Sequence, residues 1–273
     1  MARDDVLITV EALAGLAGLD EVDLLDVRWR LGDADGAGRE RYLAGHIPGA
    51  RFLDLESVLT SHGEPTDGRH PLPDVDTLEE GLGALGVSGD RLVVVYDEAG
   101  SFAASRAWWV LRWAGLNVRL LDGGLGAWTA QGRPLAEGEA QVTPVDLLLT
   151  VGHLPTITAD EAAAFDGTLM DARAPERFRG ETEPLDPVAG HIPGAVNVPV
   201  AQCFAEGGRL PDDEVLRGLL DRTGPLGAYC GSGVSAAQLV LAGAALDRSI
   251  ALYPGSWSAW SNDPSRPVAT GEH

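Results

Sequence analysis

Short, predominantly apolar runs alternate with longer amphipathic segments along the 273-residue chain. The runs at residues 92–96, 118–121 and 226–229 show no polar alternation, a pattern typical of strands buried on both faces of a parallel sheet. Residues 22–27 are a fourth strand candidate, and helices are predicted at residues 77–85 (with Thr77 and Glu80 as a capping box), 105–113 and 236–246. Helices that alternate with buried strands predict an α/β fold with parallel sheets.

The predicted elements occur twice. Residues 45–50 (Gly-His-Ile-Pro-Gly-Ala) recur unchanged at residues 190–195, and the Asp-Val-Arg that begins at Asp26 recurs as the Asp-Ala-Arg that begins at Asp171. The same interval of 145 residues separates both pairs. We therefore expect a duplicated unit, with a first domain at residues 1–135, a linker at residues 136–154 that is rich in Pro, Glu and Gly, and a second domain at residues 155–273.

The composition excludes several classes of function. The formal charge of −21 disfavours nucleic acid and anionic membranes as partners. The N-terminal residues show no signal peptide, and no apolar stretch is long enough to span a membrane. Two cysteines, Cys203 and Cys230, are too few for a secreted disulfide scaffold, so a reducing cytoplasm is expected.

Residues 230–235 (Cys-Gly-Ser-Gly-Val-Ser) connect the predicted strand at 226–229 to the predicted helix at 236–246. Backbone N–H groups converge at such a connection and the helix dipole favours negative charge, which biases a cysteine there toward the reactive thiolate. Glycines let the N–H groups face inward around a sulfur. We predict that Cys230 is a nucleophile. The first domain has Asp97 at the matching position, and a carboxylate cannot replace a thiolate, so one copy carries the chemistry.

With these motifs and the residues 70–73 (His-Pro-Leu-Pro), the chain resembles the two-domain rhodanese-type sulfurtransferases over nearly its whole length. The resemblance implies two tandem rhodanese-like domains, each a central parallel sheet flanked by helices, with the active site in the cleft between them. It also implies that Cys230 takes sulfur from a small anionic donor as a persulfide. The persulfide then passes to a thiol, thioredoxin or cyanide acceptor, without a metal or organic cofactor.

The loop sequence bears on the donor. Cys-Gly-Ser-Gly-Val resembles members of the family that prefer 3-mercaptopyruvate, whereas members that prefer thiosulfate carry basic residues after the cysteine. We expect the catalytic residues to include Ser232, which can donate or relay a proton. The resemblance adds a first-domain histidine, matched by His46, and a nearby acid, for which Asp35 and Asp33 are both candidates.

The family's substrate-binding arginine falls on Arg177, whose forked guanidinium suits a carboxylate. The other substrate-binding candidates are the loop residues Gly231, Gly233, Val234 and Ser235, and Ser235 is also expected at or near the helix N-cap. The chain departs from the mercaptopyruvate-type pattern because residues 183–189 contain no second arginine. Another departure is Pro254, where an acid is common. Thiosulfate therefore stays open as an alternative donor.

Some of these residue types have a structural interpretation as well. Cys203 is expected to fill the core, and the histidine of the second repeat, His191, is expected to hold backbone, because the motif occurs in both copies. Arg28 and Arg173 each follow an Asp at a strand end, so ion pairs within each domain are expected.

Other functions fit less well. A cysteine phosphatase needs an arginine six positions after the cysteine, where this chain has Ala236. A non-catalytic rhodanese-like binding module usually lacks the cysteine. A sulfur carrier that only relays persulfide to a partner would share the first half-reaction with a sulfurtransferase. The sequence does not distinguish these two functions.

Overall fold

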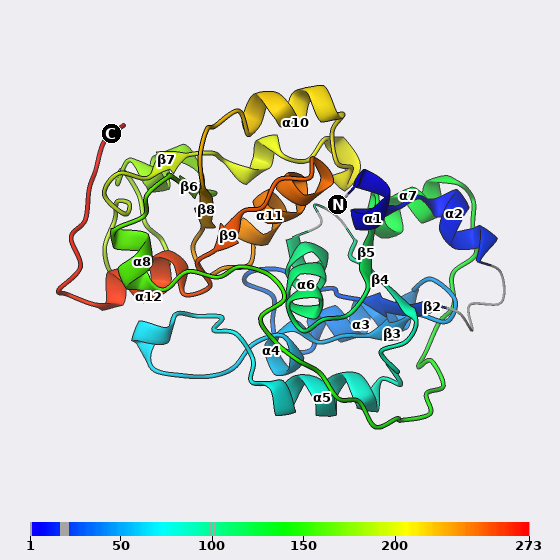
Figure 1. Cartoon of the computed structure of the whole chain (residues 1–273). Coiled ribbons are helices and arrows are strands. Elements are labelled where there is room, and N and C mark those ends of the chain that lie inside the picture. The colour runs from blue at the N-terminus through cyan, green and yellow to red at the C-terminus, as the bar shows by residue number, and fades with distance from the viewer. Residues whose placement is uncertain (1, 17–21, 99, 101, 273) are drawn as a thin grey trace.

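The computed structural model describes residues 2–16, 22–98, 100 and 102–272. Within them the chain forms two parallel sheets, each flanked by helices, which confirms the predicted α/β class and the tandem arrangement (Figure 1). The first part contains α1 (Arg3–Val6), β1 (Leu7–Ile8), α2 (Val10–Gly15), β2 (Val22–Asp26), α3 (Ala37–Ala44), β3 (Arg51–Phe52), α4 (Leu55–Val58), the 3-10 turn η1 (Pro65–Asp67), α5 (Val75–Ala84), β4 (Leu92–Tyr96), α6 (Phe102–Trp113), β5 (Val118–Leu121) and α7 (Gly124–Ala130). The second contains α8 (Ala159–Ala163), β6 (Thr168–Asp171), α9 (Pro175–Phe178), β7 (Val196–Asn197), η2 (Val200–Gln202), η3 (Glu206–Gly208), α10 (Asp213–Leu219), β8 (Leu226–Tyr229), α11 (Ala236–Ala245), β9 (Ala251–Leu252) and α12 (Ser256–Asn262).

The two sheets share one topology. The strand orders are β1-β5-β4-β2-β3 and β7-β6-β8-β9, so β2, β3, β4 and β5 correspond to β6, β7, β8 and β9. All pairings are parallel. The carboxyl ends of parallel strands meet at one edge of each sheet, which is where ligand sites form in α/β folds. Cys230 follows β8 at this edge, as Asp97 follows β4.

The duplication extends to individual hydrogen bonds. The amide of Ile47 donates to the hydroxyl of Tyr96 (3.0 Å), and the amide of Ile192 donates to the hydroxyl of Tyr229 (3.1 Å). The expected ion pairs also form within each domain, since a guanidinium N–H of Arg28 donates to Asp26 (2.8 Å) and the corresponding group of Arg173 donates to Asp171 (2.6 Å). These buried pairs fix the backbone after each central strand.

The structure shifts two of the predicted helix starts. The predicted capping box at Thr77 is wrong, because α5 begins at Val75 and its N-cap is Asp74, whose carboxylate accepts from the amide of Thr77 (2.8 Å). Helix α6 begins at Phe102 rather than residue 105. Residues 139–154 form no helix or strand and run as an extended strap. A hydrogen bond from the amide of Val145 to the carbonyl of Gly83 (3.0 Å) holds the strap against α5. The domain limits at 135 and 155 stay a prediction.

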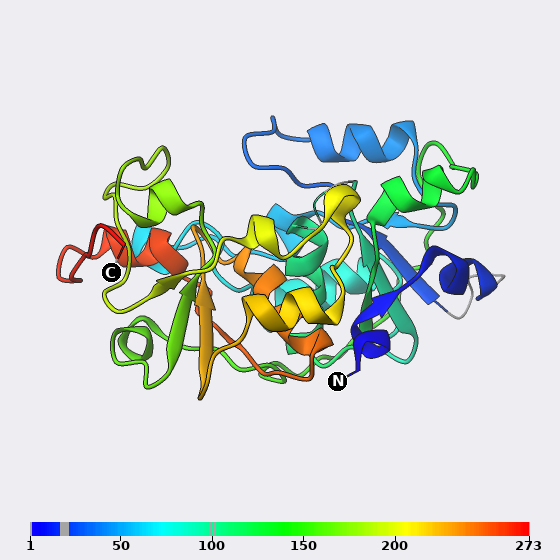
Figure 2. The ribbon, with the colours of Figure 1, turned by 90° about the horizontal axis from the view of Figure 1, so that it is seen from above.

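Helices α6 and α11 pack against each other between the two sheets, so each domain presents an apolar helix to the other (Figures 1 and 2). A second contact is made by the loop that contains η1, which leaves the first domain and packs on α12. There the amide of Arg69 donates to the hydroxyl of Ser258 (3.0 Å). No helix among the described residues is long and apolar enough to cross a membrane.

Candidate active site

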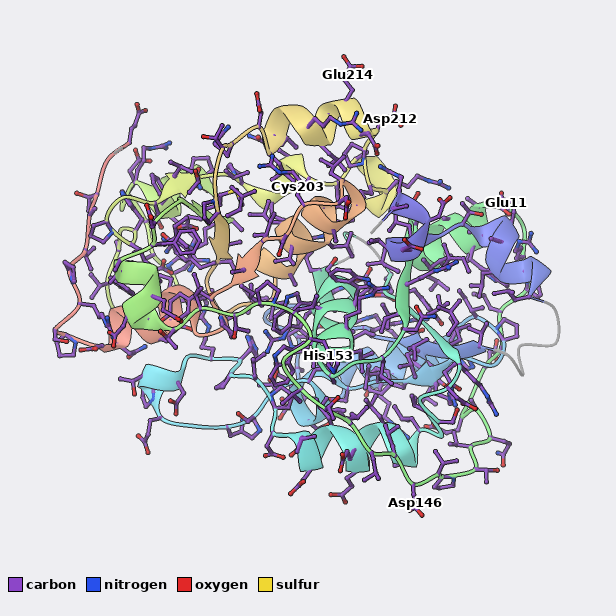
Figure 3. The ribbon with its side chains drawn as sticks, in the orientation of Figure 1. Glu11, Asp146, His153, Cys203, Asp212 and Glu214 are labelled. Atoms are coloured by element: carbon purple, nitrogen blue, oxygen red, sulfur yellow. The ribbon has the colours of Figure 1, made fainter. Side chains whose placement is uncertain are left out.

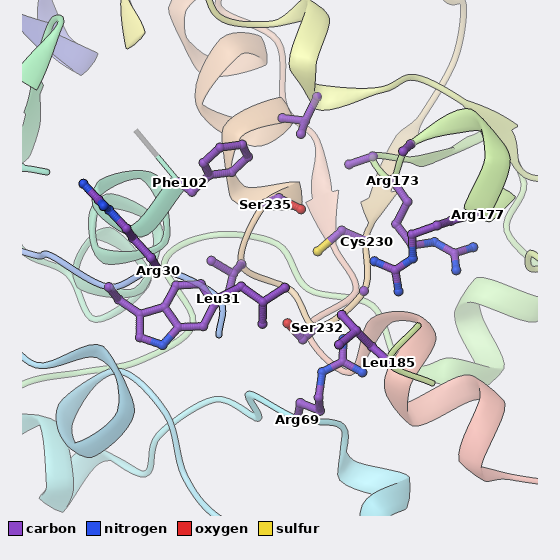
Figure 4. Close-up of a pocket in the computed structure, with 16 residues that line it drawn as sticks. Arg30, Leu31, Arg69, Phe102, Arg173, Arg177, Leu185, Cys230, Ser232 and Ser235 are labelled. Atoms are coloured by element: carbon purple, nitrogen blue, oxygen red, sulfur yellow. The ribbon is translucent and has the colours of Figure 1, made fainter. Parts of the chain in front are cut away.

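A pocket of about 500 Å³ opens between the two domains, with Cys230 at its base. Figure 4 shows Arg30, Leu31 and Phe102 on one side of the cysteine sulfur and Arg173 and Arg177 on the other. The lining comprises Trp29, Arg30, Leu31, Arg69, Phe102, Ala172, Arg173, Ala174, Arg177, Leu185, Val200, Cys230, Gly231, Ser232, Val234 and Ser235. Both domains therefore contribute to the wall around a single thiol.

The Cys230 side chain is 1% exposed and sits inside its own loop. Its Sγ accepts a hydrogen bond from the amide of Gly233 (3.1 Å). Its amide in turn donates to the hydroxyl of Ser256 (3.1 Å), at the start of α12. An N–H aimed at the sulfur stabilises a thiolate and a persulfide, which is the role predicted for the loop.

Ser256 is a functional residue that the sequence did not suggest. Its φ of 53° lies in the left-handed region, which is uncommon for a residue with a side chain. Its counterpart at the start of α7 is Gly124, with a φ of 54°. The hydroxyl of Ser256 accepts from Cys230 and donates to the carbonyl of Tyr253 (2.9 Å). The second domain thus places a hydroxyl where the first has glycine, and that hydroxyl fixes the amide of the nucleophile.

Gly233 is required by its surroundings as well as by its conformation. Its φ is 78°, and a Cβ there would lie 2.5 Å from the carbonyl oxygen of Pro254. Arg106, fully buried on α6, donates from Nη1 to the carbonyl of Gly233 (3.3 Å) and from Nη2 to the carbonyl of His70 (3.0 Å). Burial lowers the pKa of Arg106 to about 10, so the guanidinium stays charged at neutral pH. A cation of the first domain therefore braces the loop of the second.

The hydroxyl of Ser232 lies 2.7 Å from Nδ1 of His70, and Nε2 of His70 lies 3.2 Å from a carboxylate oxygen of Glu56. The same oxygen accepts from the indole N–H of Trp29 (2.6 Å). The hydrogen bond with His70 lowers the pKa of Glu56, which keeps this carboxylate ionised. Ser232, His70 and Glu56 form a connected chain from the loop of the second domain into the first.

The hydrogen-bonding partners decide the tautomer of His70. An ionised carboxylate only accepts, so Nε2 carries the proton and donates to Glu56. Nδ1 is then the acceptor for the Ser232 hydroxyl, and it can take that proton when the hydroxyl gives one to a substrate. This is the arrangement of a general base oriented by a carboxylate.

The predicted roles of His46 and Asp35 are corrected by this geometry. His46 is buried, its Nδ1 lies 3.0 Å from the carbonyl oxygen of Tyr42, and its ring stacks on that of Tyr42 at 4.1 Å. His191 repeats this with Phe178, at 2.7 Å and 3.7 Å. Neither ring lines the pocket, so the histidine in both copies of the motif forms a hydrogen bond with a backbone carbonyl. Asp35 is exposed and lies outside the Cys230 pocket.

The alternative acid, Asp33, pairs with Arg41 (2.6 Å) instead. The histidine on Ser232 is His70, the first residue of the His-Pro-Leu-Pro segment, for which the sequence predicted no catalytic role.

Most of the substrate-binding candidates are brought together. Arg177, Gly231, Val234 and Ser235 line the pocket. Gly233 lies behind them with its N–H on the sulfur. The expected cap position is confirmed, because Ser235 is the N-cap residue of α11, although its side chain makes no cap hydrogen bond.

The charges around Arg177 were not foreseen. Its Nη2 donates to Glu183 (2.5 Å) and to Asp186 (3.2 Å), and Arg69 of the first domain pairs with the same Asp186. Burial raises the pKa of Asp186, whose carboxylate lies between the two guanidinium groups. Two arginines from different domains thus share one acid at the pocket wall.

Comparisons with known proteins agree with this architecture. The rhodanese-like domain family matches residues 9–131 and 157–263. A Mycobacterium tuberculosis protein that carries the provisional name thiosulfate sulfurtransferase SseB is 48% identical, with 99% of each chain covered. A Pseudomonas aeruginosa protein provisionally named 3-mercaptopyruvate sulfurtransferase is 45% identical, with 97% of this chain and 98% of that one covered.

The crystal structure of the Escherichia coli 3-mercaptopyruvate sulfotransferase SseA has a TM-score of 0.82 and 34% identity, and the match covers 92% of this chain and 98% of that one. The match of sequence and fold extends over both domains. The chain belongs to the rhodanese-like family, as a member with two matched domains.

Proposed function

We propose that this chain is a sulfurtransferase that takes sulfur from 3-mercaptopyruvate onto Cys230 and passes it to a thiol, thioredoxin or cyanide. The observation that carries the proposal is the Ser232–His70–Glu56 chain beside the thiol. A thiol donor has a proton to lose and a carbon leaving group to protonate, and these three residues can move protons at that place.

The first half-reaction is a displacement at sulfur. The thiolate of Cys230 attacks the sulfur of 3-mercaptopyruvate, an S–S bond forms, and the C–S bond breaks. The electron pair of the C–S bond leaves on carbon as the enolate of pyruvate. The proton on the donor sulfur stays on the new persulfide or is taken up by Ser232 and His70, and one proton added to the enolate carbon gives pyruvate.

The second half-reaction restores the thiolate. A nucleophile attacks the outer sulfur of the persulfide, and the S–S bond breaks with its electron pair on Sγ of Cys230. A thiol acceptor becomes a persulfide and cyanide becomes thiocyanate, with no net oxidation. When Cys230 carries no extra sulfur, the N–H of Gly233 points at its Sγ. The thiolate that leaves in this step is therefore stabilised where it forms.

Thiosulfate is the second candidate donor, favoured by the name of the relative that is 48% identical. Its leaving group, sulfite, needs no protonation at carbon, so the Ser232–His70–Glu56 chain would have no essential task with it. For that reason we place 3-mercaptopyruvate first.

Steady-state kinetics with both donors test the proposal. We expect pyruvate release from 3-mercaptopyruvate, with a kcat/KM above that for sulfite release from thiosulfate, and no release by Cys230→Ser. A higher kcat/KM for thiosulfate would reverse the donor assignment. No turnover of either donor would overturn the enzymatic function in favour of a binding module.

A further inference from the structure

Two large apolar side chains are open to solvent on the first-domain side of the Cys230 pocket. Leu31 is 59% exposed and Phe102 is 41% exposed, and both line the pocket. Figure 4 shows them on one side of the cysteine sulfur, with Arg173 and Arg177 on the other. Exposed apolar surface in the wall of a cavity is unfavourable in water and indicates a place where an apolar group binds.

Arg30 does not make this side of the pocket cationic. Its Nη2 donates to the carboxylate of Glu98, and its guanidinium extends away from the cysteine sulfur (Figure 4). Glu98 also accepts from Nη1 of Arg28 (3.2 Å) and lies 3.0 Å from Nε of Arg41. Glu98 therefore engages the charge of Arg30 and ties down the chain before and after Leu31.

The ring of Phe102 is held at the pocket by the loop that precedes it. A Cβ built on Gly100 would lie 2.9 Å from Cε2 of Phe102, so the ring packs directly over this glycine. Phe102 is also the first residue of α6, which packs against α11 between the two sheets. The domain that has Asp97 in place of a cysteine thus holds both apolar side chains in position, which lowers the cost of binding a ligand there.

We propose that Leu31 and Phe102 form a binding site for the sulfur acceptor and select low-molecular-weight thiols with an apolar body, such as an alkyl or aryl group. The proposal rests on the function proposed above and names the class of its acceptor. Donor and acceptor reach the same sulfur in turn, and 3-mercaptopyruvate is an anion without an apolar extension, so it leaves this side of the pocket unused. Because Cys230 is 1% exposed at the base of the cavity, the acceptor has to enter the cavity, and its body then lies against the two side chains.

The transfer itself is the second half-reaction given above. The acceptor thiol loses its proton to solvent, and its thiolate attacks the outer sulfur of the Cys230 persulfide. The new S–S bond forms as the old one breaks with its electron pair on Sγ, so the acceptor leaves as a persulfide. The apolar body takes no part in these bonds, so it changes the affinity for the acceptor without changing the chemistry.

The test measures discharge of the persulfide by two thiols that differ only in chain length. Cys230 is loaded with sulfur from 3-mercaptopyruvate, excess donor is removed, and the rate constant for loss of the sulfur is measured with 3-mercapto-1-propanol and with 6-mercapto-1-hexanol. Both thiols carry the same thiol and hydroxyl ends, and three methylenes separate them. The readout is the ratio of the two second-order rate constants, which does not depend on the fraction of active protein.

We expect the longer thiol to react faster with the wild-type protein by about 2- to 4-fold per methylene, where the upper limit corresponds to full burial of each methylene. Leu31→Ala and Phe102→Ala should each lower the ratio at least about threefold. Leu31→Met keeps an apolar side chain of similar size and should retain the ratio. Leu148→Ala is the matched control and should also retain it, because Leu148 is 90% exposed on the strap and does not line the pocket.

A ratio near one in the wild-type protein would overturn the proposal, as would a wild-type ratio in both Leu31→Ala and Phe102→Ala. Either result leaves the proposed function standing, because the protein would still take up the sulfur and pass it on. Failure of the wild-type protein to gain sulfur from 3-mercaptopyruvate would instead contradict the proposed function itself.

Discussion

The ring of His70 lies 2.7 Å from the hydroxyl of Ser232, although 162 residues separate them in the chain. One comes from a loop of the first domain and the other from the cysteine loop of the second. The first domain therefore supplies more than a wall, because its His70 and Arg106 hydrogen-bond to the cysteine loop, its Arg69 lines the pocket, and its Glu56 holds His70. The active site exists only when the two domains are docked.

The Ser232–His70–Glu56 chain should matter for one donor more than the other. Because positioned proton transfer contributes about 100- to 10,000-fold to a rate, His70→Gln should lower kcat with 3-mercaptopyruvate by at least about 100-fold. Loading of Cys230 by thiosulfate should change far less, since sulfite leaves without a proton. Stopped-flow measurement of each half-reaction checks this, and equal losses with both donors would contradict it.

His46→Gln should affect stability rather than chemistry. The substitution removes the ring stacked on Tyr42 and the bond to its backbone carbonyl, which together predict a loss of about 1–3 kcal/mol in the free energy of unfolding. Its kcat with 3-mercaptopyruvate should stay at the wild-type level at a temperature where it is folded. His191→Gln is the matched control in the other repeat. A specific fall in kcat for His46→Gln would restore a catalytic role.

Replacement of Ser256 by glycine should lower the free energy of unfolding less than replacement by alanine. A left-handed non-glycine residue costs about 1–3 kcal/mol. Ser256→Gly relieves that cost and loses the bonds to Cys230 and Tyr253, so its free energy of unfolding should stay near that of wild type. Ser256→Ala keeps the strained backbone and loses the same bonds, which predicts a loss of about 1–2 kcal/mol.

Both Ser256 variants should lose activity, because the amide of the nucleophile is no longer held. We expect kcat/KM with 3-mercaptopyruvate to fall by at least about tenfold, as small misplacements of a reacting group do. Denaturant titration and steady-state kinetics of the pair check both quantities. Full activity in Ser256→Gly would show that the hydroxyl does not position Cys230.

Cys203 should stay unreactive. It follows η2 and lies beside α11 with no exposed surface (Figure 3), and burial raises the pKa of its thiol to about 12. Iodoacetamide at pH 9 should label one cysteine in the native protein, Cys230, and both in denaturant, counted by peptide mass. Because the unfolded thiol ionises at lower pH, Cys203 should also make the free energy of unfolding decrease as pH rises above about 9. Native labelling of Cys203 would contradict its burial.

The sequence predicted the fold well because its signals are local or repeated. The apolar runs at β4, β5 and β8 fall where expected, and the recurring Gly-His-Ile-Pro-Gly-Ala motif marks equivalent points of two sheets that share four corresponding strands. Cys230 was identified by the same means, since a cysteine between a strand and a helix can be read from neighbouring residues.

The rest of the site depends on contacts between distant loops, which no local pattern encodes. A repeated histidine gives no sign of which copy, if either, faces the cleft, and the structure shows that neither His46 nor His191 does. His70 reaches Ser232 only because η1 packs on α12, and Arg69 reaches the pocket by the same loop.

The most direct test of the account is the intact mass of the protein after brief exposure to 3-mercaptopyruvate without acceptor. We predict a gain of one sulfur atom, located by peptide mass on Cys230, lost on addition of cyanide with release of thiocyanate, and absent in Cys230→Ser. A protein that turns over 3-mercaptopyruvate without gaining this sulfur, or that gains it equally in Cys230→Ser, would contradict the persulfide mechanism.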